Sequence, residues 1–495
     1  MNIAGLLSHS ARCFPERPAV TWRGRTTSYG TLERQATALD RWLRDRDAAR
    51  VAVFMDNRPE MLVSMFAAFR SGATLVPCNA RLTADELGFV IGDAGAKMVI
   101  TDEAHAVTAR AAAGDAQVCV APDDLDAILA DDPGNVAPVD VGPDHIAWLF
   151  YTSGTTGHPK GAMLSHGVLT FVTVSWLADL TPLDETDVTL HAAPLSHGAG
   201  FHALAATARG AHQVILPGAS FDVAATLALI NEMGVTNTWL VPTQIVMLTD
   251  GAPDGLRLPT LGHVVYGGAP MTAAATTRAL ERWGPIFVQL YGQGETPMTA
   301  TVLRRQDHGP ETLGSAGRAR PGVEVVIAGD DGIMCGPGEV GEVVVRGPSV
   351  MSGYWNQPEA TAHTLRRGWL HTGDLGRMTD DGLLYLLDRT KDMIISGGSN
   401  VYAVEVEQAL STHASVADVA VVGVPDDLWG EVVVAVVVPA GGVAVDEQAL
   451  EAHCRASLAG YKIPRRWVVT DALPRNAYGK VVKRDVRASL ATFPS

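Results

Sequence analysis

The stretch RVAVFMDNRPEMLVSMFAAFRSGATLVPC, residues 50–78, has the pattern of a strand, a helix and a second strand. Its first five residues are strand-like, a helical pattern follows from Pro59, and a second short apolar run ends at Cys78. The alternation continues with a helical stretch over 83–93 and a strand over 97–101. This βαβα rhythm predicts a parallel sheet covered by helices on both faces.

The pattern changes twice further along the chain. A second α/β alternation runs from about 146 to 299, with apolar runs at 213–216, 238–241, 263–266 and 287–290. Next come short β-rich runs at 323–327, 342–346 and 383–387, beside Asp-Asp-Gly turns at 330–332 and 380–382. These predict a small antiparallel or barrel-like unit. A further small α/β unit is expected from 392, with helices at 403–410 and 447–458 and strands at 416–424 and 431–438.

With 495 residues, the chain is too long for one compact core. We expect an α/β protein whose large N-terminal domain, residues 1–388, has two α/β subdomains with parallel-type sheets and a small β-barrel-like subdomain. A small C-terminal α/β domain, residues 392–495, follows a short charged junction between Asp388 and Asp392.

The composition is that of a well-buried globular protein, with 47% hydrophobic and 19% charged residues. The formal net charge is -16, with 38 Lys and Arg against 54 Asp and Glu, and no stretch gathers basic residues into a block. This argues against nucleic acid as a partner. The protein is expected to be a monomer or a homodimer.

The cysteines do not form a framework of disulfides or a zinc site. There are five, far apart and without a CxxC pair: Cys13, Cys78, Cys119, Cys335 and Cys454. The N-terminus lacks a basic and apolar leader, and no apolar run reaches the roughly 18 residues of a membrane span. We therefore expect a cytoplasmic protein without a membrane span.

The strongest local motif is YTSGTTGHPKGA at 151–162, which follows an apolar run. Glycines let the backbone approach a polyanion, hydroxyl groups donate hydrogen bonds and a lysine adds positive charge, so this loop is typical of a phosphate-binding site. The residues concerned are Thr152, Ser153, Gly154, Thr155, Thr156, Gly157 and Lys160. A GxxxxGK[ST] loop does not fit, because Pro159 precedes the lysine and Gly161 follows it. A plain surface loop would not explain the lysine or the preceding strand.

The loop resembles the signature of the adenylate-forming superfamily, which includes acyl-CoA synthetases, luciferases and the adenylation domains of peptide synthetases. Further motifs resemble that family in the family's order, over nearly the whole chain. They are PLSHGAG at 194–200, YGGAP at 266–270, YGQGE at 291–295, GWLHTGDLG at 368–376, DRTKDMIISGGSN at 388–400 and PRNAYGK at 474–480.

The resemblance implies a site for ATP and Mg²⁺. Tyr291 would stack on adenine, and Glu295, with Thr155, would serve the metal, for which a carboxylate oxygen is a suitable ligand. Nucleotide contacts are also implied for Gly268, Ala269, Pro270, Gly292 and Gln293. The common family pattern has threonine before the glutamate, whereas this chain has Gly294, so one phosphate hydrogen bond is in question. A dinucleotide fingerprint is not supported, because Pro297 replaces its last glycine.

The resemblance implies ribose and acid contacts as well. Asp374, expected in a Gly-Asp turn, would accept hydrogen bonds from the ribose hydroxyls, assisted by Arg389. His197 would lie at the acyl pocket, where a binding role is favoured over proton transfer, although a lone histidine is more often structural. A zinc cluster of His191, His197 and His202 is rejected, because no cysteine or carboxylate joins them at ligand spacing.

Lys480 is the residue expected to be most important for catalysis. An anionic carboxylate must attack an anionic α-phosphate, so the transition state requires positive charge, which the matching family lysine supplies. In PRNAYGK, Tyr478 replaces the usual serine or threonine. The resemblance also implies a hinge at 389–391 centred on Lys391, a loop at Gly397 and Gly398 for the thiol step, and coenzyme A contacts from Trp429 and Arg465.

The implied reaction is that of an AMP-forming acyl-CoA synthetase. The segments expected to line the acid pocket, 195–201, 238–243, 266–268 and 297–299, contain no Arg or Lys. A dicarboxylate would require a buried cation, so a medium-chain, branched, alicyclic or aromatic monocarboxylate is favoured. Two alternatives stay open: an adenylating enzyme that passes the acyl group to a carrier protein or to oxygen, and a non-catalytic nucleotide-binding regulator.

Overall fold

The computed structural model describes residues 2–134, 136–152, 159–329, 332–389, 392–396, 399–426, 429–441, 443–475 and 480–490. In this part of the chain the first sheet has six strands. In spatial order they are β6 (Gln117–Ala121), β5 (Met98–Asp102), β3 (Arg50–Phe54), β4 (Thr74–Cys78), β7 (Ile146–Thr152) and β8 (Lys160–Ser165). All pair in parallel except β7 and β8, which form an antiparallel hairpin.

The helices between these strands begin and end at residues with clear local reasons. Helix α3 (Pro59–Ser71) starts with proline, whose fixed φ suits the first turn, and stops at Gly72, which has φ +72°. Helix α4 (Ala84–Ala94) starts with a reciprocal capping box between Thr83 and Glu86. The elements predicted between residues 50 and 101 are thus confirmed to within one or two residues.

The second sheet has nine strands in the described residues, with parallel pairing at its centre and antiparallel strands at both edges. In spatial order they are β15 (Arg318–Ala319), β14 (Thr296–Leu303), β13 (Phe287–Gln293), β12 (His263–Tyr266), β11 (Asn237–Leu240), β9 (Val188–His191), β10 (His212–Ile215), β1 (Pro18–Trp22) and β2 (Arg25–Ser28). The outer face packs against α9 (Val223–Glu232), α10 (Pro242–Gly251) and α11 (Ala273–Trp283).

One expectation about these sheets was wrong, and one strand pairing had not been predicted. The hairpin of β7 and β8 belongs to the first sheet, although residue 146 was expected to open the second α/β alternation. The N-terminal hairpin of β1 and β2 joins the second sheet, where β1 pairs with β10 nearly 200 residues later. An apolar run specifies a strand but not the sheet that it joins, because the pairing partner is distant in sequence.

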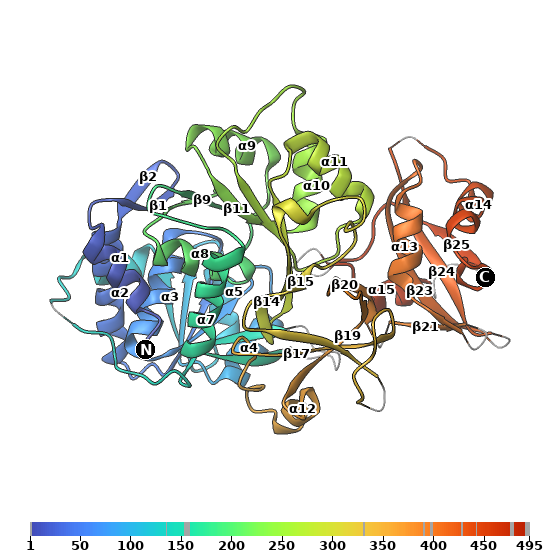
Figure 1. Cartoon of the computed structure of the whole chain (residues 1–495). Coiled ribbons are helices and arrows are strands. Elements are labelled where there is room, and N and C mark those ends of the chain that lie inside the picture. Colours follow the sequence, from blue (N-terminus) through green and yellow to red (C-terminus); the bar gives the residue numbers. More distant parts are fainter. Residues whose placement is uncertain are drawn as a thin grey trace.

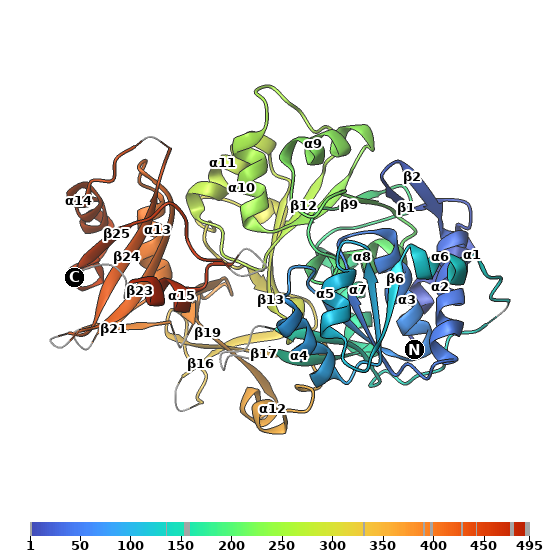
Figure 2. The same ribbon diagram turned by 180° about the vertical axis from the view of Figure 1, so that it is seen from behind.

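A layer of helices lies between the two sheets. It includes α3, which contacts both β1 and β3, α7 (His166–Asp179) and α8 (Gly198–Ala208), which contacts β9, β10 and β11. Helices α1 (Gly5–Cys13), α2 (Tyr29–Arg44), α5 (Ala106–Ala112) and α6 (Asp123–Ala130) complete the first half of the molecule, as the view from behind shows (Figure 2). A single apolar cluster that includes Trp148, Trp176 and Phe201 joins the layers.

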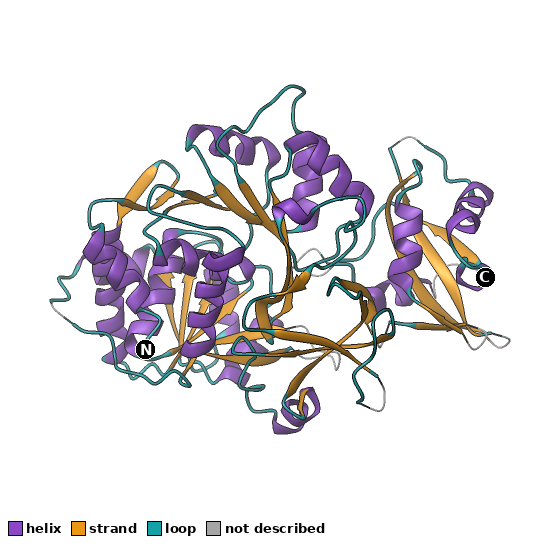
Figure 3. Cartoon of the chain, viewed as in Figure 1, coloured by secondary structure: helices purple, strands orange, loops and turns teal. Residues whose placement is uncertain are grey.

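The third sheet is antiparallel, as predicted for residues 315–388. It consists of β16 (Glu324–Ala328), β17 (Val340–Arg346), β19 (Trp369–Met378), β18 (Leu365–Arg366) and β20 (Leu384–Arg389), and α12 (Pro358–Thr364) lies beside it (Figure 3). The Gly-Asp turn expected at Asp374 was wrong. Gly373 has φ +70°, but the chain continues through Asp374 as part of the ten-residue strand β19.

The C-terminal unit lies to one side of the three sheets (Figure 1, orange to red). Its sheet contains β22 (Ser399–Val401), β21 (Ile394–Ser396), β24 (Gly430–Pro439), β23 (Val416–Asp426) and β25 (Arg466–Val469), with helices α13 (Ala403–Ser411), α14 (Glu447–Ser457) and α15 (Lys483–Leu490). Asp388, near the end of β20, accepts a 2.8 Å hydrogen bond from the backbone N–H of Ala403. Within the described residues no helix has both the length and the apolar character that crossing a membrane requires.

Candidate active site

Glu295 lies in the turn between β13 and β14 and is only 8% exposed. Its Oε1 accepts hydrogen bonds from the Thr152 hydroxyl at 3.1 Å and from the Tyr354 hydroxyl at 2.7 Å. The structure therefore joins the end of β7, where the glycine-threonine motif begins, to the carboxylate of YGQGE. Sequence analysis missed Tyr354, which belongs to none of the recognised motifs.

Strand β8 is hydrogen-bonded along both of its edges. One edge pairs with β7, and Thr152 is opposite Lys160. The other edge meets residues 352–355 through hydrogen bonds between Met163 and Gly353 and between Trp355 and Gly161. Lys160 lies with Nζ 5.2 Å from the centroid of the Tyr354 ring. The predicted residues Ser153, Gly154, Thr155, Thr156 and Gly157 lie outside the described residues.

Three side chains predicted to bind the nucleoside converge where the last residues of β13 meet the middle of β19. Oδ2 of Asp374 accepts hydrogen bonds of 2.7 Å from the Tyr291 hydroxyl and from Nε2 of Gln293. Nε2 of Gln293 also donates to the carbonyl oxygen of Thr372. The backbone of Arg389 is the direct partner of Asp374 across β19 and β20. Residues from two sheets thus form one polar group.

The YGGAP segment follows β12, the strand that pairs with β13 in the second sheet. Gly267 packs so closely on the next strand that a Cβ atom would lie 2.6 Å from the carbonyl oxygen of Leu290. Gly268 is exposed and has φ +82°, which favours glycine. Ala269 and Pro270 continue the loop before α11. Gly292 is equally confined, since a Cβ there would lie 2.8 Å from the backbone nitrogen of Met298.

His197 precedes the first residue of α8 and is half-buried. Its Nδ1 lies 2.8 Å from the Ser196 hydroxyl, and its ring meets the edge of Phe150 at a centroid distance of 5.2 Å. Burial lowers the pKa of His197 to about 3, so the ring is neutral at ordinary pH. A neutral, packed imidazole fits a contact with an acyl group better than proton transfer.

The segments predicted to line the acid pocket meet at Gly198. A Cβ atom on Gly198 would lie 2.2 Å from Cε of Met298 and 2.7 Å from Cζ2 of Trp239. Three of the four predicted segments, 195–201, 238–243 and 297–299, therefore contact one another. Met298 has φ +60°, an unusual conformation for a long side chain, and its carbonyl oxygen accepts a hydrogen bond from the buried Arg320. No local sequence signal marks this strained position.

The glycine that replaces the family threonine has a steric reason. A Cβ atom on Gly294 would lie 2.4 Å from Cγ2 of Thr152 and 2.6 Å from Cδ1 of Phe150. Phe150 thus occupies the volume that a threonine at 294 would need, which accounts for the departure without loss of Glu295.

His191 and His202 form a buried ring contact at a centroid distance of 5.8 Å, and His202 stacks on Trp176. Nε2 of His191 lies 2.9 Å from the side-chain oxygen of Gln213. Burial lowers the pKa of His191 to about 4 and that of His202 well below its usual value. Their environment is that of core histidines, and in the described residues the metal-type cluster lies elsewhere, at Asp56, Asp102 and His105.

The residues predicted to act from the C-terminal unit are partly described. Lys480 is exposed and lies beside an isolated bridge between Arg475 and Val481. The guanidinium of Arg465 lies 3.9 Å from the centroid of the Trp429 ring, so the two residues expected to contact coenzyme A stack on each other. Lys391, Gly397 and Gly398 lie outside the described residues.

The donor set at Glu295 suits a hard divalent cation. Both side-chain hydrogen bonds of Glu295 fall on Oε1, and in the described part of the chain Oε2 makes none. A buried carboxylate with one uncommitted oxygen is the type of ligand that Mg²⁺ takes when it also binds phosphates.

Comparison with known proteins identifies the family of the chain. The family model of the AMP-binding enzyme matches residues 7–355, and the model of the AMP-binding enzyme C-terminal domain matches residues 405–480. A feruloyl-CoA synthase from an Amycolatopsis species is 42% identical over 483 residues, 96% of each chain. An indoleacetate–CoA ligase from Aromatoleum aromaticum is 37% identical over an aligned length of 508, covering 99% of this chain and 98% of that one.

Among solved structures, ATP-bound MatB from Rhodopseudomonas palustris is 32% identical and matches with a TM-score of 0.89 over 99% of both chains. The expected fold class, with its parallel sheets, antiparallel third sheet and small C-terminal α/β unit, is confirmed. The chain belongs to the AMP-binding enzyme family, within the adenylate-forming superfamily, and is an acid–thiol ligase of the acyl-CoA synthetase branch.

Proposed function

We propose that this ligase activates a compact monocarboxylate, aromatic, alicyclic or of medium chain length, with ATP and transfers it to coenzyme A. In the first half-reaction a carboxylate oxygen attacks the α-phosphorus, a C–O–P anhydride link forms and pyrophosphate leaves. In the second, the thiolate of coenzyme A attacks the carbonyl carbon, a C–S bond forms and AMP leaves with the oxygen. Activation as an adenylate gives the thiol a good leaving group to displace.

The convergence of Tyr291, Gln293 and Asp374 is the observation that carries this proposal. Asp374 accepts the ribose hydroxyls, with Arg389 assisting from the paired strand, and the Tyr291 ring stacks on adenine. The ring is already oriented, because its hydroxyl is fixed to Asp374. Gly268, Ala269, Pro270 and Gly292 complete the nucleotide contacts.

Glu295 and Thr155 would hold Mg²⁺, and Lys160 with the hydroxyl groups of Ser153 and Thr156 would contact the phosphates. The cation, when bound, offsets the negative charge of the pyrophosphate leaving group. Lys480 supplies positive charge to the reacting oxygens.

Residues 389–391 form the hinge about which the C-terminal unit turns between the two half-reactions. The turn withdraws Lys480 and brings Gly397 and Gly398 to the acyl-adenylate. The stacked pair of Trp429 and Arg465 contacts the coenzyme A chain, where the guanidinium suits a phosphate group.

The acid lies beside His197 in the pocket that Gly198, Met298 and Trp239 close. The tight contact among these residues supports a compact acid and argues against a long alkyl chain at that depth. The predicted lining contains no Lys or Arg, which disfavours a second carboxylate. The two relatives named above are a feruloyl-CoA synthase and an indoleacetate–CoA ligase, and both names refer to aromatic acids.

The test is pyrophosphate release over a panel of carboxylic acids, followed by a hydroxylamine trap with and without coenzyme A. We expect pyrophosphate release with aromatic or alicyclic acids, a trapped hydroxamate without coenzyme A, and a thioester with it. A trapped hydroxamate with no thioester would indicate a different acceptor, such as a carrier protein. Nucleotide binding with no acid-dependent pyrophosphate would indicate a regulator.

A further inference from the structure

The loop of residues 55–58, which follows β3 in the first sheet, reaches across to the second sheet through Asn57. Nδ2 of Asn57 donates a 2.7 Å hydrogen bond to the carbonyl oxygen of Ala193, and Oδ1 accepts a 2.8 Å hydrogen bond from the N–H of Leu195. A carbonyl only accepts and an N–H only donates, so these two partners fix the orientation of the amide. One side chain thereby clamps both ends of a three-residue segment more than 130 residues away.

The clamped segment leads directly to the acyl side of the site. Ala193 and Leu195 are fully buried, and the carbonyl oxygen of Leu195 packs so tightly on Gly200 that a Cβ there would lie 2.3 Å away. The N–H of His197 donates to the carbonyl oxygen of Pro194 at 3.0 Å, which closes a tight turn. The position of His197, and of Gly198 after it, therefore follows from where Leu195 is held.

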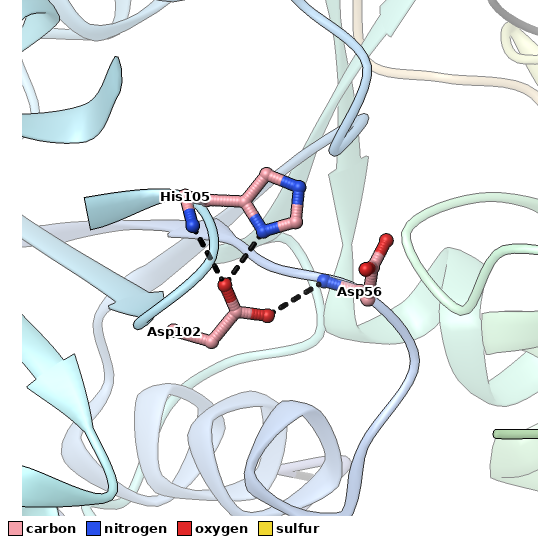
Figure 4. A group of neighbouring side chains, drawn as sticks. All are labelled: Asp56, Asp102 and His105. Carbon is pink, nitrogen blue, oxygen red and sulfur yellow. Dashed lines mark hydrogen bonds and ion pairs between the residues drawn. The ribbon is translucent and has the colours of Figure 1, made fainter. Parts of the chain in front are cut away.

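The other end of the link is braced by Asp56, Asp102 and His105 (Figure 4). Oδ2 of Asp102 accepts from the backbone N–H of Asp56 at 3.2 Å, and Oδ1 accepts from the backbone N–H and Nδ1 of His105 at 3.0 and 2.6 Å. In Figure 4 the Asp56 carboxylate points away from Asp102. Both oxygens of Asp102 accept hydrogen bonds from the loop or from His105, so Asp102 braces the loop.

Arg58 completes the brace on the other side of Asn57. Its Nε donates to Glu60 at 2.8 Å, and its NH1 group donates to Glu103 at 3.2 Å. The neighbours of Asn57 on both sides are therefore fixed to the first turn of α3 or to the connection between β5 and α5. Asn57 extends from a rigid support, so its amide can set the position of a partner.

We infer that Asn57 is a positioning residue for acid binding, which transmits the fixed geometry of the first sheet to the loop that carries His197. This inference rests on the proposed function, because it takes the acid to bind beside His197 and Gly198. The nucleotide contacts lie on other elements, at the ends of β7 and β13 and in the middle of β19. Loss of the Asn57 clamp should therefore weaken binding of the acid and leave binding of ATP unchanged.

The experiment compares Asn57→Ala and Asn57→Asp with the wild type, by pyrophosphate release at varied acid and varied ATP. Asn57→Ala loses two hydrogen bonds, so we expect the KM for the acid to rise about tenfold and the KM for ATP to change less than about twofold. Asn57→Asp keeps an oxygen that can accept from the N–H of Leu195 but has no N–H to donate to Ala193. Its KM for the acid should lie between that of the wild type and that of Asn57→Ala. Hydrogen exchange of residues 191–200 gives a readout that needs no activity, and exchange should be faster in Asn57→Ala.

Thr101→Val is the matched control. It removes a buried 2.7 Å hydrogen bond to the carbonyl oxygen of Phe54 at the end of β3 and leaves both side-chain hydrogen bonds of Asn57 in place. We expect it to lower the thermal midpoint but to leave the KM for the acid and exchange over 191–200 unchanged. Unchanged exchange in Asn57→Ala, or equal changes in the KM of acid and ATP, would overturn the inference. A wild type that releases no pyrophosphate with any acid would refute the proposed function, while the exchange measurement would still decide the role of Asn57.

Discussion

The hydroxyl group of Tyr354 donates a 2.7 Å hydrogen bond to Oε1 of Glu295, which lies 59 residues earlier in the chain. The same Tyr354 ring lies beside the ammonium group of Lys160, at 5.2 Å from its centroid to Nζ. One side chain thus orders the proposed metal ligand and a proposed phosphate contact. It stands where the segment 352–355 pairs with β8, so its position follows from the sheet rather than from a mobile loop.

Tyr354→Phe should weaken the use of MgATP. The substitution keeps the ring beside Lys160 and removes a hydrogen bond to a charged group, so we expect kcat/KM for ATP to fall about tenfold or more, with the KM for the acid unchanged. Pyrophosphate release at varied ATP and Mg²⁺ measures this. Tyr151→Phe is the control. Tyr151 lies on β7, and the substitution removes its 2.6 Å hydrogen bond to Asp93 of α4. It should lower stability without changing the KM for ATP.

Gly294→Thr should reduce activity although it restores the common family residue. Its Cβ would clash with Thr152 and Phe150, and overpacking of this kind costs about 1–3 kcal/mol. Because Thr152 also contacts Glu295, we expect a lower thermal midpoint and a lower rate of adenylation. The pair Gly294→Thr with Phe150→Ala should recover part of both, and failure of the second substitution to help would show that Phe150 is not the obstacle.

Met298→Ala should shift acid preference toward larger acids. Removing the side chain that closes the pocket against Gly198 leaves room for several carbon atoms, and each methylene in an apolar pocket changes specificity by about tenfold or more. The measurement is kcat/KM over a homologous series of acids. Met271→Ala, the same truncation at a buried methionine of another cluster, should leave the ranking unchanged. An unaltered ranking in Met298→Ala would remove this residue from the pocket.

Lowering the pH should destabilise the large domain at pH values well above the pKa of its carboxylates. Burial lowers the pKa of His166 and His191 from 6.5 to about 4, so between these values the unfolded chain binds protons that the folded chain does not. The free energy of unfolding therefore falls as the pH drops from 6.5 to 4, by about 1.4 kcal/mol per pH unit for each histidine. Urea unfolding at several pH values measures the slope. His191→Gln should reduce the slope by the contribution of one histidine. An unchanged slope would show that His191 does not contribute to the pH dependence.

Lys480→Ala should separate the two half-reactions. Removal of charge that stabilises only the adenylation transition state should slow pyrophosphate release by about a hundredfold or more. Conversion of supplied acyl-adenylate to thioester should persist, as measured by AMP release with coenzyme A. Lys462→Ala, which breaks an ion pair with Glu405 in the same unit, should retain both steps. Equal loss of both steps in Lys480→Ala would mean that the lysine has another role.

Local patterns in the sequence predicted the elements well where the physical cause is local. The run at Arg50–Phe54 is fully apolar after its first residue, and Pro59 and Gly72 mark the ends of α3, so these boundaries needed no tertiary information. The turn predicted at Gly373 and Asp374 was wrong because it rested on the local pattern alone. Its left-handed glycine is typical of a turn, but here it lies opposite an irregularity in the pairing with β17, and Asp374 pairs directly with Arg389 of β20.

The sequence predicted only those residues of the candidate site that lie within recognisable motifs. Tyr291, Gln293, Glu295 and Asp374 lie in recognisable motifs, and hydrogen bonds join the first two of them to Asp374. Tyr354 and Asn57 stand in no such motif, and their partners lie 59 and more than 130 residues away. Contacts of that kind arise from how the sheets pack together, which a single sequence does not encode locally.

Asp374 and Arg389 are opposite each other across β19 and β20, and the proposed hinge begins at Arg389. The first residue of the proposed hinge and the carboxylate proposed to bind the ribose are therefore direct partners in one strand pair. We therefore expect a nucleotide bound at Asp374 to stiffen the hairpin of β19 and β20, from which the C-terminal unit departs. Binding of the ribose and rotation of the C-terminal unit are then expected to be coupled through this hairpin, so that each would affect the other.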